Sequence, residues 1–297
     1  MSRWPLAGCT RRHEEIGDER TAAEYGTNMS VMADFAFDEM TLSDGVLQMQ
    51  QGVRPDLAVE EVRHALDALA EQAQTALQAV SDETSRLQGL LTLFFGEWAF
   101  GGVGGVYRLS DALWLDKVLA CRQGTPASLG VILQQVAQRL ALPVQAVVFP
   151  TQLLLRADWP DGSVWLINPL NGERLERALL AVWLKGHLGM QAEVSDEDLA
   201  AAENSQVVRR LLATLKTALM EEQQIELALN ACEALLQFDP EDPYEIRDRG
   251  LIYARLECPH IALSDLNYFV EQCPEDPVAD VIKLQIHAIE AFTVVLH

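Results

Sequence analysis

The sequence predicts an α+β domain followed by an all-α helical repeat region. Amphipathic helical patterns come first, and short segments rich in branched and aromatic residues follow them, which is the element order of an α+β domain. Further along, a four-residue motif recurs at the period of a two-helix repeat. We therefore expect a flexible N-terminal extension (1–31), the α+β domain (32–200) and the helical region (201–297).

Helical periodicity dominates the first half of the α+β domain. Apolar residues three or four apart predict one helix over about 56–69 and a second over about 84–98, because this spacing places them on one face. Ser110 is expected to cap a third helix, since a serine hydroxyl can accept a hydrogen bond from a free N–H of the first turn.

A fourth helix and a set of strands complete this domain. The helix is expected to begin at Pro126, where the missing N–H would be unpaired in any case, and to end near Pro143. The strands expected after it are 144–149, 153–157 and 163–168. Asp161-Gly162 supplies a tight turn between the last two strands, so these strands should pair antiparallel.

The C-terminal region carries the repeat. The motif Pro-Glu-Asp-Pro begins at Pro240 and again at Pro274, and this separation matches the tetratricopeptide period of about 34 residues. Gly250 and Tyr253 stand at consensus positions of a first helix, Ala262 at its crossing with a second helix, and Pro274 at the end of that helix. Small residues at such a crossing let two helices approach closely, so these four residues are expected to pack the repeat.

Helix pairs of this kind are expected over about 208–291. Roughly three or more repeat units are needed for independent stability, and two alone bury too little surface. We therefore predict that the helical region packs against the first domain instead of forming a free tail.

The acidic composition limits the possible partners. Lys and Arg total 22 against 44 Asp and Glu, and the net charge of −22 repels the phosphates of nucleic acid and of anionic lipid. The basic pairs Arg11-Arg12 and Arg209-Arg210 are too short to make a basic patch, and no apolar run approaches the length of a membrane span. We expect a protein or peptide partner, with neither nucleic-acid binding nor membrane insertion.

The residues that could bind metals or cofactors form no recognisable site. The five cysteines make no Cys-x-x-Cys pair and no zinc spacing, which is typical of reduced thiols in the cytoplasm. His187 and His260 belong to no spaced ligand set. The glycine-rich run 101–105 lacks the Lys-Ser/Thr and the preceding strand of a phosphate loop, so a flexible loop is expected there. No metal and no cofactor is therefore predicted.

Four segments together resemble one protein family. They are RLSDALWLDKVLACRQGTPASLG, LALPVQAVVFPTQLLLR, WLINPLNGE and FDPEDPYEIRDRGLIYARLE. They resemble the bacterial SirB-type family of transglutaminase-like and tetratricopeptide proteins, and the resemblance covers about 32–297. It implies a fold related to papain-like thiol enzymes, in which a Cys begins the central helix and a His and an Asp lie on neighbouring strands.

The same resemblance implies that the catalytic positions have changed. Counting back from Pro143 by the spacing at which the transglutaminase motif places its Cys gives Pro126. The His position reads Gln152 and the Asp position reads Asn168. A thiol enzyme needs a nucleophile, a base and a carboxylate that orients the base, so we predict a degenerate site without turnover. The three side chains should lie within about 10 Å of one another, a loose bound for a site once built on hydrogen-bond reach.

Two displaced nucleophiles keep an enzymatic alternative open. Cys121 precedes the expected central helix and would need a base, for which His187 is the only nearby histidine in sequence. Ser128 lies in the first helical turn, where serine more often caps or packs than attacks. The leading hypothesis is a non-catalytic adaptor, and the alternative is a thiol- or serine-dependent hydrolase or acyltransferase. The glycine-rich run 101–105 is expected to cover the old cleft.

Overall fold

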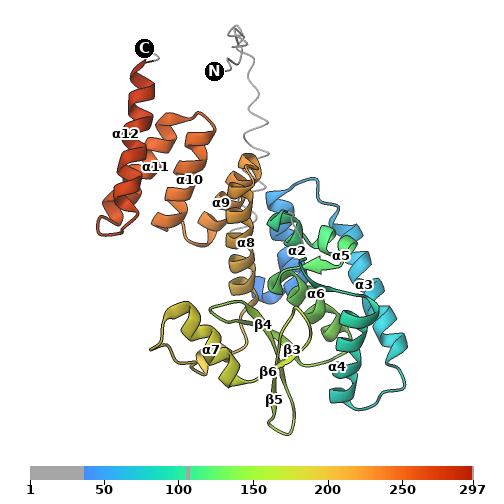
Figure 1. Ribbon diagram of the computed structural model, residues 1–297. Helices are drawn as coiled ribbons and strands as arrows, with labels where there is room; N and C mark the ends of the chain where they lie inside the picture. Colours follow the sequence, from blue (N-terminus) through green and yellow to red (C-terminus); the bar gives the residue numbers. More distant parts are fainter. Residues whose placement is uncertain (1–36, 105–107, 296–297) are drawn as a thin grey trace.

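A computed structural model describes residues 37–104 and 108–295 and shows an α+β domain followed by helical repeats (Figure 1). The predicted extension 1–31 lies outside the described residues. The longer helices of the first domain are α2 (Leu42–Val53), α3 (Val59–Ala76), α4 (Glu83–Thr92), α5 (Leu115–Cys121), α6 (Pro126–Arg139) and α7 (Arg177–Leu188). The helical region contains α8 (Asn204–Glu221), α9 (Ile225–Phe238), α10 (Pro243–Arg255), α11 (Pro259–Gln272) and α12 (Ala279–Val295).

The main sheet is an antiparallel meander that separates two helices. Its strands, in order, are β3 (Val144–Val148), β4 (Leu153–Asp158), β5 (Val164–Ile167) and β6 (Arg174–Leu175). Side chains alternate between the faces, as strand geometry requires. Leu153 and Leu155 of β4 join the core with α6, whereas Leu154 between them packs with Leu180 of α7 on the opposite face. The order of helices first and antiparallel strands after is therefore confirmed.

Short irregular helices link these elements. They are η1 (Phe37–Glu39), the π-helical turn η2 (Leu93–Glu97), η3 (Leu109–Ala112) and η4 (Glu197–Leu199). The helix expected over 84–98 consists of α4 and η2. Gly162, with φ of +83°, occupies the left-handed position of the tight turn between β4 and β5, as a glycine readily does.

The predicted capping role of Ser110 is wrong. Ser110 lies inside η3, and Trp114 takes the N-cap position of α5 without a side-chain cap. The Ser110 hydroxyl instead donates to Glu222 Oε2 over 2.6 Å, and the Ser110 N–H donates to Glu222 Oε1 over 2.9 Å. The N–H and the hydroxyl of Ser110 are thus paired with the Glu222 carboxylate at the end of α8, and not with the first turn of the helix that Ser110 was expected to cap.

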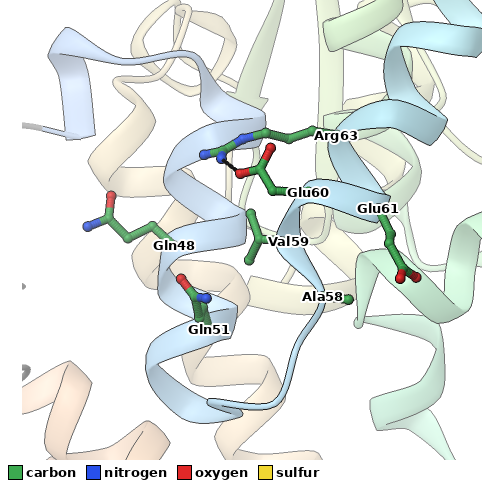
Figure 2. A pocket seen from close by; sticks show the side chains of 7 residues that line it. All are labelled: Gln48, Gln51, Ala58, Val59, Glu60, Glu61 and Arg63. Atoms are coloured by element: carbon green, nitrogen blue, oxygen red, sulfur yellow. Dashed lines mark hydrogen bonds and ion pairs between the residues drawn. The ribbon is translucent and has the colours of Figure 1, made fainter.

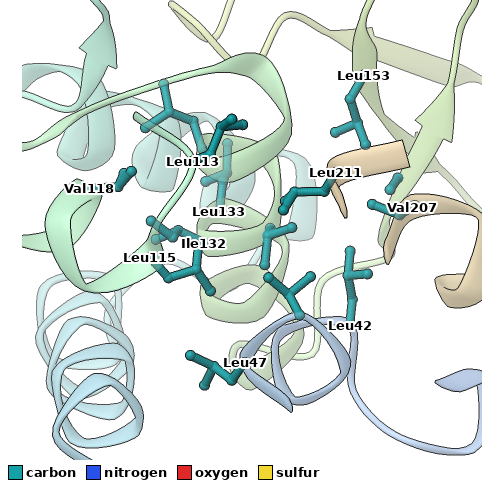
Figure 3. Close-up of a cluster of buried hydrophobic side chains, with 14 of the residues drawn as sticks. Leu42, Leu47, Leu113, Leu115, Val118, Ile132, Leu133, Leu153, Val207 and Leu211 are labelled. Atoms are coloured by element: carbon teal, nitrogen blue, oxygen red, sulfur yellow. The ribbon is translucent and has the colours of Figure 1, made fainter. Parts of the chain in front are cut away.

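One hydrophobic core joins the first domain to the first helices of the repeat region. Figure 3 shows side chains of α2, α5, α6 and α8 gathered in it, among them Leu42 of α2 and Leu211 of α8. The α8 residues that it buries are each at most 1% exposed, and they are Val207, Val208, Leu211, Leu212, Leu215, Ala218 and Leu219. Because helix α8 is covered on this face by the first domain, the repeats do not form a free tail.

Hydrogen bonds to main-chain carbonyls fix this contact. Arg210 of α8 donates to the Phe149 and Pro150 carbonyl oxygens over 2.9 and 3.1 Å, and Asn204 donates to the Met40 carbonyl oxygen over 2.8 Å. Asn230 of α9 donates to the Val53 carbonyl oxygen over 3.0 Å. Side chains of α8 and α9 therefore pair with carbonyl groups just after β3 and at the two ends of α2. These carbonyl groups would be costly to bury without a partner.

The repeat residues lie where successive helices cross. A Cβ atom at Gly250 on α10 would lie 3.0 Å from both Asp265 Cβ and Leu266 Cγ of α11, so only glycine fits this crossing without adjustment. Ala262 is fully buried on α11. Tyr253 donates from its hydroxyl to Glu233 over 3.3 Å.

The loops between repeat units are built alike. In the first Pro-Glu-Asp-Pro motif, Asp242 caps α10 by accepting from the N–H of Tyr244 over 2.9 Å. In the second, Pro274 follows the end of α11, and Asp276 accepts from the N–H of Val278 over 2.7 Å, just before α12. The Tyr244 hydroxyl also donates to Asp276 over 2.9 Å, which ties the two motifs together.

A buried ion cluster holds α8 against α10. Lys216 on α8 is 4% exposed and donates to Glu245 and Asp248 of α10. Burial by itself lowers the pKa of Lys216, but the two carboxylates outweigh it, so the net shift of this pKa is upward. The ammonium is therefore kept charged, and its contribution to stability is present at neutral pH and is lost only as pH rises through the raised pKa.

A matched pair of glycine substitutions tests the tight crossing of α10 and α11. Gly250→Val should lower the free energy of unfolding by about 1–3 kcal/mol, because the new side chain overpacks the crossing. Gly186→Val on α7 should leave it nearly unchanged, since a Cβ there meets nothing within 4 Å and valine replaces a poor helix former. Urea unfolding followed by circular dichroism measures both. Equal losses in the two variants would contradict the crossing.

Removal of the first domain tests the dependence of the repeats on it. A fragment of residues 201–297 would expose the α8 face that the first domain covers in the whole chain. We expect it to have much less helix per residue than the full chain and to unfold without a cooperative transition. Thermal unfolding by circular dichroism decides this. A fully helical fragment with a sharp transition would show that the repeats are self-sufficient.

Candidate functional site

The first turn of α6 is closed by a reciprocal cap. Thr125 precedes the helix, and its Oγ1 accepts from the N–H of Ser128 over 3.3 Å, while Ser128 Oγ accepts from the N–H of Thr125 over 3.0 Å. Pro126 occupies the first helical position. The sequence folds this way because threonine is a strong N-cap residue and proline fits the turn that follows.

Gln152 and Asn168 lie next to each other across two strands. Gln152 directly precedes β4, Asn168 directly follows β5, and Gln152 Nε2 donates to Asn168 Oδ1 over 3.4 Å. Asn168 Oδ1 also accepts from the N–H of Leu170 over 3.1 Å, and Asn168 is 9% exposed. The side chain of Asn168 therefore shapes the turn after β5, a common use of asparagine.

Helix α6 packs against the segments that carry these two amides. A Cβ atom at Gly130, one turn after Pro126, would lie 2.5 Å from Leu153 Cδ2 and 3.7 Å from Pro169 Cγ. Leu153 and Pro169 directly follow Gln152 and Asn168 in the chain. The structure thus brings Gln152 and Asn168 together beside the first turns of α6, and the convergence of all three side chains within the expected bound stays a prediction.

The glycine-rich run is partly a strand. Gly101–Gly102 forms β1, which pairs in parallel with β2 (Gln123–Gly124) just before α6. A Cβ atom at Gly102 would lie 3.3 Å from Leu170 Cδ2. The expectation of a flexible loop is therefore corrected for these two glycines, because backbone pairing fixes them between the start of α6 and the turn that follows Asn168.

No histidine in the described part of the chain forms a hydrogen bond with Cys121 or Ser128. Ser128 is fully buried, and its hydroxyl donates to the Ala112 carbonyl oxygen over 2.6 Å. Cys121 is exposed at the end of α5 and lies 3.5 Å from the Gln123 carbonyl oxygen. His187 is on α7, which covers the sheet face opposite α6. His260 is exposed at the start of α11.

The remaining thiols and acidic side chains do not form a metal site in the described part of the chain. No group of three or more His, Cys, Asp or Glu side chains is placed there to hold an ion. Cys258 is exposed and Cys273 is half-buried, while Cys9 lies outside the described residues. Cys232 is buried on α9, and this burial raises the pKa of its thiol to about 12.

Two open grooves lie between α2 and α3, away from Pro126, Gln152 and Asn168. Figure 2 shows side chains that line the first, among them Gln48 and Gln51 of α2 and the paired Glu60 and Arg63 at the start of α3. The second continues from it, because Gln48 and Arg63 line both, and reaches Gln135 of α6. These grooves were not predicted from the sequence, since most of their polar residues have the pattern of ordinary solvent-facing helix positions.

No helix among residues 37–104 and 108–295 is both long and apolar enough to cross a bilayer.

The fold and the residue pattern define a transglutaminase-like domain joined to tetratricopeptide repeats. The family model of the transglutaminase-like superfamily matches residues 60–213, and that of a tetratricopeptide repeat matches residues 215–287.

Similar proteins place the chain within one family. It is 54% identical over 269 residues to Protein SirB1 of Salmonella typhimurium and 52% identical over 269 residues to UPF0162 protein YchA of Escherichia coli, covering 91% of this chain and 100% of each relative. It is 39% identical to a UPF0162 protein of Vibrio cholerae over 258 residues, or 87% of this chain and 96% of that protein. The chain belongs to the family of SirB1 and the UPF0162 proteins.

Thiol labelling tests the environment of the cysteines. At pH 8, iodoacetamide should modify exposed Cys121 and Cys258 quickly, whereas Cys232 should react orders of magnitude more slowly, because its thiolate is scarce and covered. The rate at Cys232 should keep rising toward pH 12. Peptide mass spectrometry gives the rates, and labelling in urea provides the control. Similar native rates at Cys232 and Cys121 would contradict the burial.

Proposed function

We propose that this chain is a non-catalytic protein-interaction protein whose transglutaminase-like site is degenerate. The observation that carries the proposal is the use of the site's polar groups in local structure. The Ser128 hydroxyl is committed to the cap of α6 and to the Ala112 carbonyl oxygen, and the Asn168 amide oxygen accepts from Leu170 and Gln152. Groups bound in this way hold the fold together and are poorly placed to attack a substrate.

The chemistry of the three replaced positions supports the same proposal. Pro126 has no lone pair that can attack a carbonyl carbon. The neutral amide of Gln152 cannot take up and return a proton near pH 7, and Asn168 lacks the charge that stabilises an imidazolium. A thiol mechanism would have to replace all three roles from elsewhere in the chain.

Partner binding is the role that tetratricopeptide repeats favour, because stacked helices present extended surfaces. The net charge of −22 favours basic partners. We place the protein in the cytoplasm, on the basis of its scattered cysteines, which show no disulfide spacing.

The second candidate is a hydrolase or acyltransferase with a displaced nucleophile. The exposed thiol of Cys121 favours it, since a reagent can reach that sulfur. What the alternative needs is a base within hydrogen-bond reach, and the sheet lies between α6 and the helix that carries His187.

A turnover assay separates the two candidates. The unmodified chain should show no hydrolysis or acyl transfer above background with a panel of amide and ester substrates. Matched Cys121→Ala and Ser128→Ala variants should be indistinguishable from it in this assay. Turnover that disappears in either variant would favour the enzyme.

The triple variant Pro126→Cys, Gln152→His and Asn168→Asp tests the geometry of the degenerate site. If the three positions converge, the new thiol should react with iodoacetamide at least tenfold faster than the exposed Cys121 at pH 7, because a histidine beside it favours the thiolate. A triple variant in a Cys121→Ala background isolates the new signal. Reactivity no higher than that of Cys121 would show that the positions do not form a site.

A further inference from the structure

The two grooves between α2 and α3 form one continuous polar surface. Gln48 and Arg63 line both grooves; Gln51 lines only the first groove (Figure 2), and Gln135 lines only the second. Between Ser43 and Gln51, helix α2 rises roughly 12 Å, at about 1.5 Å per residue. A peptide in extended conformation covers that length with about four residues.

The grooves contain amide groups that are unpaired, or only partly paired, among the described residues. Gln135 is nine-tenths buried, at 9% exposed, and its Oε1 accepts from Ser43 Oγ over 2.8 Å. Gln135 lines the second groove, and no described residue accepts a hydrogen bond from its Nε2. Gln48 is half-buried and its amide makes no hydrogen bond with a described residue. Both amides can pair with main-chain N–H and C=O groups.

The charge of the grooves is negative. Arg63 is paired with Asp44 and Glu60, and Arg139 is paired with Asp67. Glu61 forms no ion pair with a described residue, so its carboxylate is available to a ligand cation. The positive charges of Arg63 and Arg139 are thus neutralised by carboxylates of the protein, and the groove lining contains more carboxylates than guanidinium groups.

We propose that the continuous groove between α2 and α3 binds an extended peptide segment of a partner protein that carries Lys or Arg. The amides of Gln48 and Gln135 pair with the peptide main chain, and the carboxylate of Glu61 with its basic side chain. This inference rests on the proposed function of protein interaction and assigns that function to one surface.

Selection from a displayed library of random linear hexapeptides on the full-length protein tests the groove. Selected peptides should be enriched in Lys or Arg. Their affinity, measured by fluorescence polarisation, should fall at least tenfold for Glu61→Lys, which reverses the charge, and about five- to tenfold for Gln48→Met, which removes hydrogen bonds to the main chain. Neither side chain supports a described hydrogen bond or ion pair, so both variants should fold.

Gln135→Met should also weaken binding. Because this change removes the acceptor of the Ser43 hydroxyl as well, its effect is used only together with those of Glu61→Lys and Gln48→Met. Gln74→Met is the matched control, because Gln74 is exposed on α3 outside the groove lining. This control should bind the peptides as the unmodified chain does.

The outcomes of the selection distinguish failure of the groove proposal from failure of the proposed protein-interaction function. Peptides that bind all four variants equally would overturn the groove and leave protein interaction standing at another surface. Selection of no peptide would also overturn the groove proposal. Capture of proteins from native lysate would then test the adaptor proposal separately. Acidic peptides that depend on Arg63 would overturn the charge assignment.

Discussion

Burial of one face of α8 is the interaction on which the rest of the structure depends. Seven apolar side chains of this helix lie in the core that joins the first domain to the repeats. At about 1.5–3 kcal/mol for each fully buried side chain, their burial is worth on the order of 10 kcal/mol, which is as large as the net stability of many domains. Surface ion pairs contribute far less, so this face of α8 sets the position of every later helix.

The same helix extends the first domain's hydrogen bonding into the repeats. Arg210 satisfies carbonyl groups after β3, and Glu222 at the C-terminal end of α8 takes both polar hydrogens of Ser110. On its other side, Lys216 carries the contact on to α10 through a buried ion cluster. The transglutaminase-like part and the repeats are consequently joined by α8 through both apolar and polar contacts.

Local signals in the sequence predicted much of this fold. Periodicity located α3, α4, α6 and the strands β3 to β5, and the recurrent Pro-Glu-Asp-Pro motif located the repeat helices, because each signal reflects contacts between residues near in the chain. Helix α2 was missed, although Thr41 caps it, since buried polar residues such as Ser43 and Gln50 obscure its apolar face. The role of Ser110 was also missed, because its partner Glu222 is 112 residues away.

The site was predicted in the same uneven way. The family resemblance singled out Gln152 and Asn168, which the structure joins by a hydrogen bond. It could not show that Ser128 forms hydrogen bonds in the cap of α6. It also could not show that Gln135 and Gln48 line one surface, because α2 and α6 meet only in the folded chain. A glutamine on a helix carries no signal of its own until the facing helix is known.

Native-state hydrogen exchange measured by mass spectrometry tests the central claim most directly. If α8 belongs to the core of the first domain, its central amides should exchange with the same opening free energy as those of α6. Helices α11 and α12, which pack in a separate apolar cluster, should exchange faster. Exchange of α8 together with α12, and much faster than α6, would contradict the account.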